Sequence, residues 1–166
     1  MRTSSRDIDW LLDVLDEAYD RPAWHGPNLR AALRGLSAAR AAWRPAPGRH
    51  SIWELALHCA YWKYAVCRRL VGGPRGSFPR HPGNFPSVPP RGDATAWTVD
   101  LALLDEQHQR LREAVAALPV ARLKGRRVGA APARLIYGVA AHDIYHAGQI
   151  RLLVTLSGGR GTTRRR

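Results

Sequence analysis

The chain has 166 residues, 45% of them hydrophobic, and carries a formal net charge of +13 at pH 7. This length suits one domain with a buried core. Because no apolar run is long enough to cross a bilayer and the first residues lack the apolar segment of a secretory signal, we expect neither a membrane protein nor a secreted one. The charge comes almost entirely from scattered arginines that do not alternate with exposed aromatic residues. This pattern favours a solvated basic surface over a nucleic-acid-binding groove.

The first predicted helix runs from about Ser5 to Tyr19, where apolar residues recur at helical spacing. A stretch containing Pro22 and Pro27 then breaks the pattern. Two shorter helical pieces are predicted around Leu29–Leu36 and Ser37–Trp43.

The second long helix has a clear start signal, because Ser51 and Glu54 have the spacing of a capping box. Its apolar stripe continues until the glycines at positions 72 and 73. His58 falls between apolar positions of this stripe, so we expect it to border the core.

The two cysteines, Cys59 and Cys67, lie eight residues apart on the second helix. That spacing separates them by about 12 Å, which is too far for a mutual disulfide and suits a reducing cytoplasm. Cys59 points about 100° away from His58 on the helical wheel, so we interpret it as a core residue and not as a metal ligand.

The segment 72–96 holds half of the twelve prolines and has no helical period. A connection of this length inside a compact domain is usually functional or disordered. Phe78, His81 and Phe85 give it side chains with which to dock. The segment could be a lid beside a pocket or an ordered but inert crossover, and the sequence does not decide between these two interpretations.

The third long helix is predicted from Trp97 to Leu118, with apolar residues at alternating steps of four and three. His108 falls on this seam. A buried histidine with a hydrogen-bond partner is favoured there over one that lines a site.

The fourth long helix is predicted to begin at Pro132 and to end near Leu156. Its inward stripe is expected to contain Leu135, Val139, His142, His146, Gln149 or Ile150, and Leu153. The folded domain should therefore span residues 1–157, and the basic segment 158–166 should be a disordered tail.

Three histidines on these helices are the strongest functional signal. His142 and His146 are four residues apart and so project from one helix face. With His58 they would form a neutral three-nitrogen site with one position left open, as catalytic metals require. A set of three separately satisfied core histidines is the alternative, but metal binding is favoured. The spacing leaves zinc, nickel, copper and iron open, whereas a di-iron bundle is excluded because the chain has no Glu-x-x-His motif.

Three neighbours can be assigned by helical angle. Gln149 lies about 20° from His142, so it could orient a bound water or substrate, or bond across the bundle. Asp143 lies about 60° from His146 and could accept a ring N–H, although a surface salt bridge suits it equally. Trp62, one turn after His58, is expected to form a wall of the pocket.

Two segments, HSIWELALH at 50–58 and AHDIYHAGQI at 141–150, resemble the DinB-like (YfiT-like) superfamily, and WHGP at 24–27 fits one of its branches. The resemblance extends over nearly the whole chain but is strong only at the histidine segments. It implies an all-α, up-down-down-up four-helix bundle with a long connection between helices 2 and 3, often packed as a homodimer. It also implies that His58, His142 and His146 bind a divalent metal, commonly zinc or nickel.

The resemblance is less specific about the reaction. Members include thiol-dependent S-transferases that use bacillithiol or mycothiol, a mycothiol-dependent maleylpyruvate isomerase, and proteins described only as metal-dependent hydrolases. We expect a metal-dependent thiol S-transferase that acts on small molecules, with arginines near the mouth available for a carboxylated low-molecular-weight thiol. A metal-dependent hydrolase and a non-catalytic metal-binding stress or interaction protein are the alternatives, so whether the chain is an enzyme stays open.

Overall fold

The computed structural model describes residues 5–72, 76–123 and 131–158. Over these ranges the regular secondary structure is all helical and has no strand, as the sequence predicts. None of the described helices combines the length and the apolar character needed to span a membrane. The elements in chain order are α1 (Ser5–Tyr19), α2 (Leu29–Leu33), α3 (Ala38–Ala42), α4 (Ile52–Val71), α5 (Ala94–Ala116), the 3₁₀ turn η1 (Val120–Arg122) and α6 (Pro132–Gly158).

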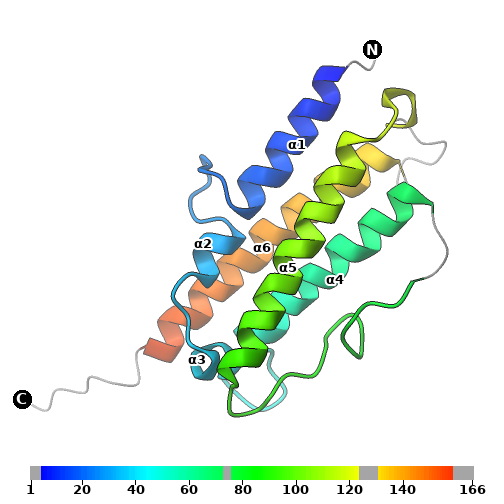
Figure 1. Ribbon diagram of the computed structural model, residues 1–166. Coiled ribbons are helices and arrows are strands. Elements are labelled where there is room, and N and C mark those ends of the chain that lie inside the picture. The colour runs from blue at the N-terminus through cyan, green and yellow to red at the C-terminus, as the bar shows by residue number, and fades with distance from the viewer. Residues whose placement is uncertain (1–4, 73–75, 124–130, 159–166) are drawn as a thin grey trace, which may run out of the picture.

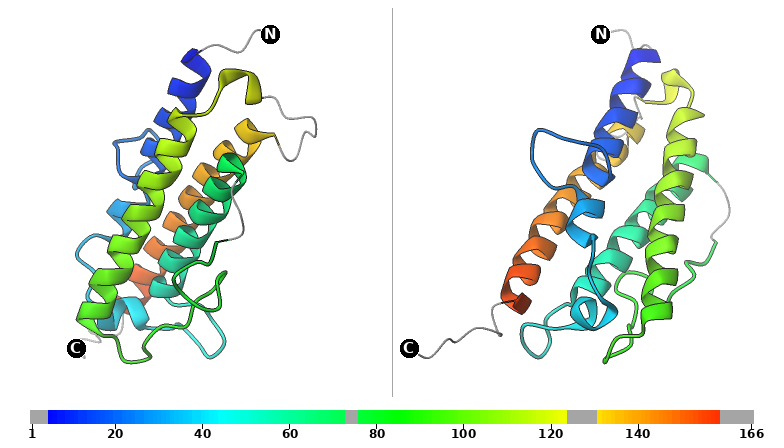
Figure 2. Two further views of the ribbon diagram at one scale, coloured as in Figure 1. Left: turned by 45° about the vertical axis from the view of Figure 1, so that its right-hand side comes forward. Right: turned by 60° about the vertical axis from the view of Figure 1, so that its left-hand side comes forward.

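Four long helices lie side by side and form the body of the molecule (Figures 1 and 2). Helix α4 packs against both α5 and α6, and α1 packs against α6 and α5. Helices α4 and α5 run in one direction, while α1 and α6 run in the other (Figure 1). The chain must therefore return along the length of the molecule between α4 and α5, and residues 76–93 of that return contain no helix or strand.

The helix ends follow from capping residues. Ser51 caps α4, with the Glu54 amide donating to Ser51 Oγ at 3.2 Å and the Ser51 amide donating to Glu54 Oε2 at 2.8 Å. This reciprocal pair is the predicted capping box. Gly72 ends α4 in the left-handed conformation, which glycine adopts without steric cost. Asp93 caps α5 through the Ala96 amide, so α5 begins three residues before the predicted start at Trp97.

The short helices and the chain end differ modestly from expectation. Helix α2 ends at Leu33, three residues before the predicted end, and α3 is the five-residue Ala38–Ala42 with Ser37 as its cap. Gly158 is the last residue of α6 and not the first residue of a tail. The remainder of the predicted tail, 159–166, lies outside the described residues.

A buried ion pair between α4 and α6 interrupts the apolar core. Lys63 and Asp143 both have 0% of their surface exposed, and the Lys63 ammonium bonds the Asp143 carboxylate. Lys63 Nζ also lies 3.3 Å from His108 Nδ1, and His108 stacks on Tyr19 with ring centroids 3.8 Å apart. Burial, with Lys63 and Arg112 nearby, lowers the pKa of His108 to about 2, so this ring is neutral. His108 is therefore the hydrogen-bonded core histidine that the sequence predicts.

The buried face of α6 is rotated from the predicted stripe. Asp143 is fully buried, whereas Leu135 and His142 are only half-buried. A surface salt bridge was one interpretation of Asp143, and it is wrong because the partner ammonium comes from inside the core. The buried positions of α6 are Ile136, Val139, Ala140, Asp143, His146, Ala147, Ile150 and Leu153.

Candidate metal centre

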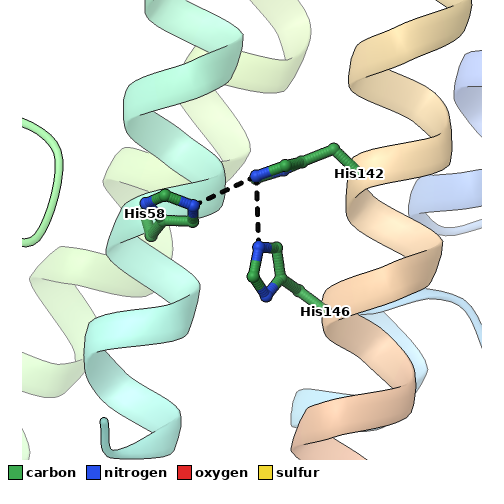
Figure 3. Close-up of side chains that lie close together, drawn as sticks. All are labelled: His58, His142 and His146. Carbon is green, nitrogen blue, oxygen red and sulfur yellow. Dashed lines mark hydrogen bonds between the residues drawn. The ribbon is translucent and has the colours of Figure 1, made fainter.

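The three predicted histidines converge between α4 and α6. His142 Nε2 lies 3.1 Å from His58 Nε2 and 3.1 Å from His146 Nε2 (Figure 3). His58 projects from α4, while His142 and His146 project from successive turns of α6. The three rings are held close by the packing of α4 against α6. Helix packing thus brings together residues that are 84 positions apart in the chain.

Hydrogen bonds at the far side of two rings fix which nitrogen faces the centre. His58 Nδ1 lies 2.7 Å from the backbone carbonyl oxygen of Asn84, and His146 Nδ1 lies 2.7 Å from Gln149 Oε1. Because a carbonyl or amide oxygen only accepts, Nδ1 carries the proton in both rings. The lone pair of each Nε2 is therefore directed toward His142, as a metal ligand requires.

The three imidazoles are also held neutral. Burial lowers the pKa of His58, opposed in part by its bond to Asn84, and burial lowers the pKa of His146, opposed in part by Gln149. For His142, burial together with the neighbouring His146 and His58 lowers the pKa to about 3. Metal binding needs deprotonated ring nitrogens, so burial prepares the set for a cation.

The spacing of the nitrogens fits a small divalent ion. Nitrogens that lie about 2.05 Å from a tetrahedral zinc ion are about 3.3 Å apart, close to the 3.1 Å separations here. The ligand atoms of all three histidines lie within 4.8 Å of one another. Three facing nitrogens, two of them with lone pairs directed inward, form a cluster that a cation would stabilise.

A second group of potential ligands shares His142 with the first but is less suitable. Cys59, His142 and Asp143 offer ligand atoms within 4.8 Å of one another. Burial raises the pKa of the Cys59 thiol well above its usual value, so the thiol keeps its proton. The Asp143 carboxylate is already paired with the Lys63 ammonium. The three-histidine set is therefore the stronger metal site.

The predicted neighbours take different positions. The Trp62 ring lies 6.1 Å from the His142 ring and lines a pocket with it, as expected for a wall. Gln149 does not face the three ring nitrogens, because its amide oxygen is bound behind His146 and its amide nitrogen donates to the Tyr145 hydroxyl at 3.0 Å. Asp143 is bound to Lys63, and no hydrogen bond joins it to His146 in the described structure.

The segment between α4 and α5 contributes to the centre in a way that the sequence did not reveal. Phe85 is sandwiched between two imidazoles, stacking on His58 at 4.0 Å and on His50 at 3.9 Å between ring centroids. The adjacent Asn84 carbonyl holds His58. Phe85 was recognisable as a docking residue, but a backbone carbonyl leaves no signal in the sequence.

Two pockets adjoin the centre along the groove between α4 and α6. One, of about 240 Å³, is lined by residues that include Trp62 and His142. The other, of about 420 Å³, is lined by residues that include His50 and Gln149. The first pocket therefore gives small molecules access to His142, whereas the second borders the centre only through Gln149, which bonds His146.

One of the comparisons with known proteins found a match. The family model of the DinB superfamily matches residues 9–150, which include all three histidines. Neither a search of curated proteins nor a search of solved structures found a match.

Proposed function

Because the chain belongs to the DinB superfamily, we propose that it is a divalent-metal protein in which His58, His142 and His146 hold the ion. The convergence of three Nε2 atoms, two with their tautomer fixed, carries this proposal. The fold that we assign to it is the four-helix bundle of the DinB (YfiT-like) type, with a long connection between its second and third helices. Zinc or nickel suits the three-nitrogen donor set.

We propose further that the protein is an enzyme that transfers a low-molecular-weight thiol to a small electrophile. A bound divalent cation would supply the positive charge that stabilises the thiolate form of the thiol. The protein's own contribution is to hold three neutral imidazoles in place. Asn84 and Phe85 orient His58, while Gln149 orients His146.

Asp143 and Glu54 are already paired with other groups, which favours thiol transfer over hydrolysis. A free thiol has a pKa of about 8.5 and water one of about 15.7, so hydrolysis depends more on a general base than thiol transfer does. Asp143 is bound to Lys63. Glu54 is bound to Arg44 at 2.7 Å and to the Ser51 amide. Both carboxylates are therefore committed elsewhere.

An S-transfer assay tests this function directly. Metal-loaded protein is incubated with monochlorobimane and, in turn, cysteine, glutathione, bacillithiol and mycothiol. In the reaction the thiol releases its proton to the buffer, a carbon–sulfur bond forms and chloride leaves, which makes the product fluorescent. We expect one thiol to react above the uncatalysed rate, and His142→Ala to abolish that excess.

The matched control is His25→Ala, which removes an exposed histidine outside the centre and should keep the full rate. If no thiol in the panel reacts faster than in buffer, the transferase assignment is wrong and a non-catalytic metal protein is favoured. The homodimer and the cytoplasmic location stay predictions.

A further inference from the structure

The smaller pocket beside the centre is an apolar groove between α4 and α6. Val66, Leu135 and Val139 provide its walls, and Trp62 and His142 stand where it meets the metal centre. Helices α4 and α6 run in opposite directions (Figure 1). The other lining residues follow Trp62 on α4 and precede His142 on α6, so the groove lies to one side of the centre. Its polar surface is small, and apolar walls of this kind bind the apolar body of a ligand.

Two arginines stand at the other end of this groove, one on each helix. Arg69 and Arg134 both line the pocket and are exposed. Neither guanidinium has a hydrogen bond or ion pair within the described part of the chain, where several other arginines pair with carboxylates. All 13 acidic residues of the chain lie in that part, so no Asp or Glu side chain elsewhere can neutralise the pair.

The positions of these groups set the length of a ligand. Arg134 precedes His142 by eight residues on one helix, which corresponds to about 12 Å along the axis. A molecule of roughly this length could place an anionic group between the guanidinium groups and its other end beside His142. Arginine binds carboxylate and sulfonate oxygens with paired N–H donors.

Gly138 keeps the middle of the groove open. It lies within α6 and lines the pocket, and a Cβ added there would meet no atom within 4 Å. A glycine inside a helix costs about 0.5–1 kcal/mol relative to alanine. The position therefore gives up some helix stability and leaves space on the groove side.

We propose that this groove binds a small organic anion with an apolar body, whose acidic group is held by Arg69 and Arg134 and whose other end reaches His142. Within the transferase proposal, on which this inference rests, the groove is the subsite for the electrophilic substrate. The apolar walls favour such an acceptor over a sugar- or peptide-like thiol, whose hydroxyl and amide groups would be buried without partners.

Binding of two matched probes tests the proposal without any activity. The sulfonate 8-anilinonaphthalene-1-sulfonate and its uncharged counterpart N-phenyl-1-naphthylamine share one ring system, and both fluoresce in apolar sites. We expect Arg69→Gln and Arg134→Gln each to weaken binding of the sulfonate about fivefold, as suits an exposed ion pair. Binding of the uncharged probe should not change.

Two further variants keep the result specific. Arg151→Gln removes another exposed arginine of α6 that lines no described pocket, and it should leave both probes unaffected. Gly138→Leu fills the groove and should abolish binding of both probes, while circular dichroism verifies the fold. Equal weakening by Arg151→Gln, unchanged sulfonate binding in both groove arginine variants, or retained binding in Gly138→Leu would overturn the proposal.

The probes are titrated into chelator-treated protein as well as metal-loaded protein. Binding that survives in chelator-treated protein, with no thiol transfer in the separate assay, would reject the enzyme and leave the anion site standing. Thiol transfer without probe binding would reject the groove alone.

Discussion

Lys63→Met should destabilise the protein by about 3–5 kcal/mol, because it leaves the Asp143 carboxylate buried without its counter-charge. Both side chains have 0% exposure, so water cannot replace the lost partner. Burial already raises the pKa of Asp143 above its usual value, with Lys63 opposing that rise. Urea unfolding of the variant and the wild type at pH 7 measures the difference.

The double variant Lys63→Met, Asp143→Ala should recover most of this loss, because it removes both buried charges together. The matched control is Arg110→Met, which breaks an exposed ion pair with Glu106 and should cost under about 1 kcal/mol. The interpretation fails if Lys63→Met costs no more than this control, or if the double variant is as unstable as the single one.

Zinc or nickel should raise the melting temperature of the wild-type protein by about 10 °C. A ligand at a thousand times its dissociation constant stabilises the native state by about 4 kcal/mol, and in a domain of this size each kcal/mol shifts the midpoint by about 2–4 °C. His142→Ala should lose nearly all of this gain, because His142 Nε2 lies 3.1 Å from the Nε2 atoms of both other histidines. Differential scanning fluorimetry with and without chelator measures the shift in melting temperature.

His25→Ala serves as the control here too, since His25 is exposed and no described contact ties it to the centre. It should respond to metal as the wild type does. An equal rise in His142→Ala would locate the stabilising ion elsewhere, and no rise in the wild type with either metal would reject the site.

Periodicity and capping predict much of the fold. The expected bounds of α1 match the structure, and the Ser51 and Glu54 capping box begins α4 as expected. The convergence of the three histidines follows from the i, i+4 pair and the apolar setting of His58. These features depend on interactions within one helix or on which face of a helix is buried, which a single sequence records.

The features that the sequence did not predict depend on contacts between residues that are far apart in the chain. Lys63 follows Cys59 by four residues on the buried face, so its position marks it as a core residue, but its partner Asp143 is 80 residues away. The buried face of α6 accordingly includes Asp143, which the predicted stripe omitted. The contacts of Asn84 and Phe85 with His58 depend on the path of a segment that has no periodicity.

The central claim is that His58, His142 and His146 together bind one divalent ion. The zinc X-ray absorption spectrum of protein loaded with one equivalent and then desalted tests it most directly. We predict nitrogen neighbours at about 2.0–2.1 Å, with the outer-shell scattering of three imidazoles and no sulfur at about 2.3 Å. A zinc–sulfur distance that implicates Cys59, fewer than three imidazoles, or loss of the zinc on desalting would contradict the account.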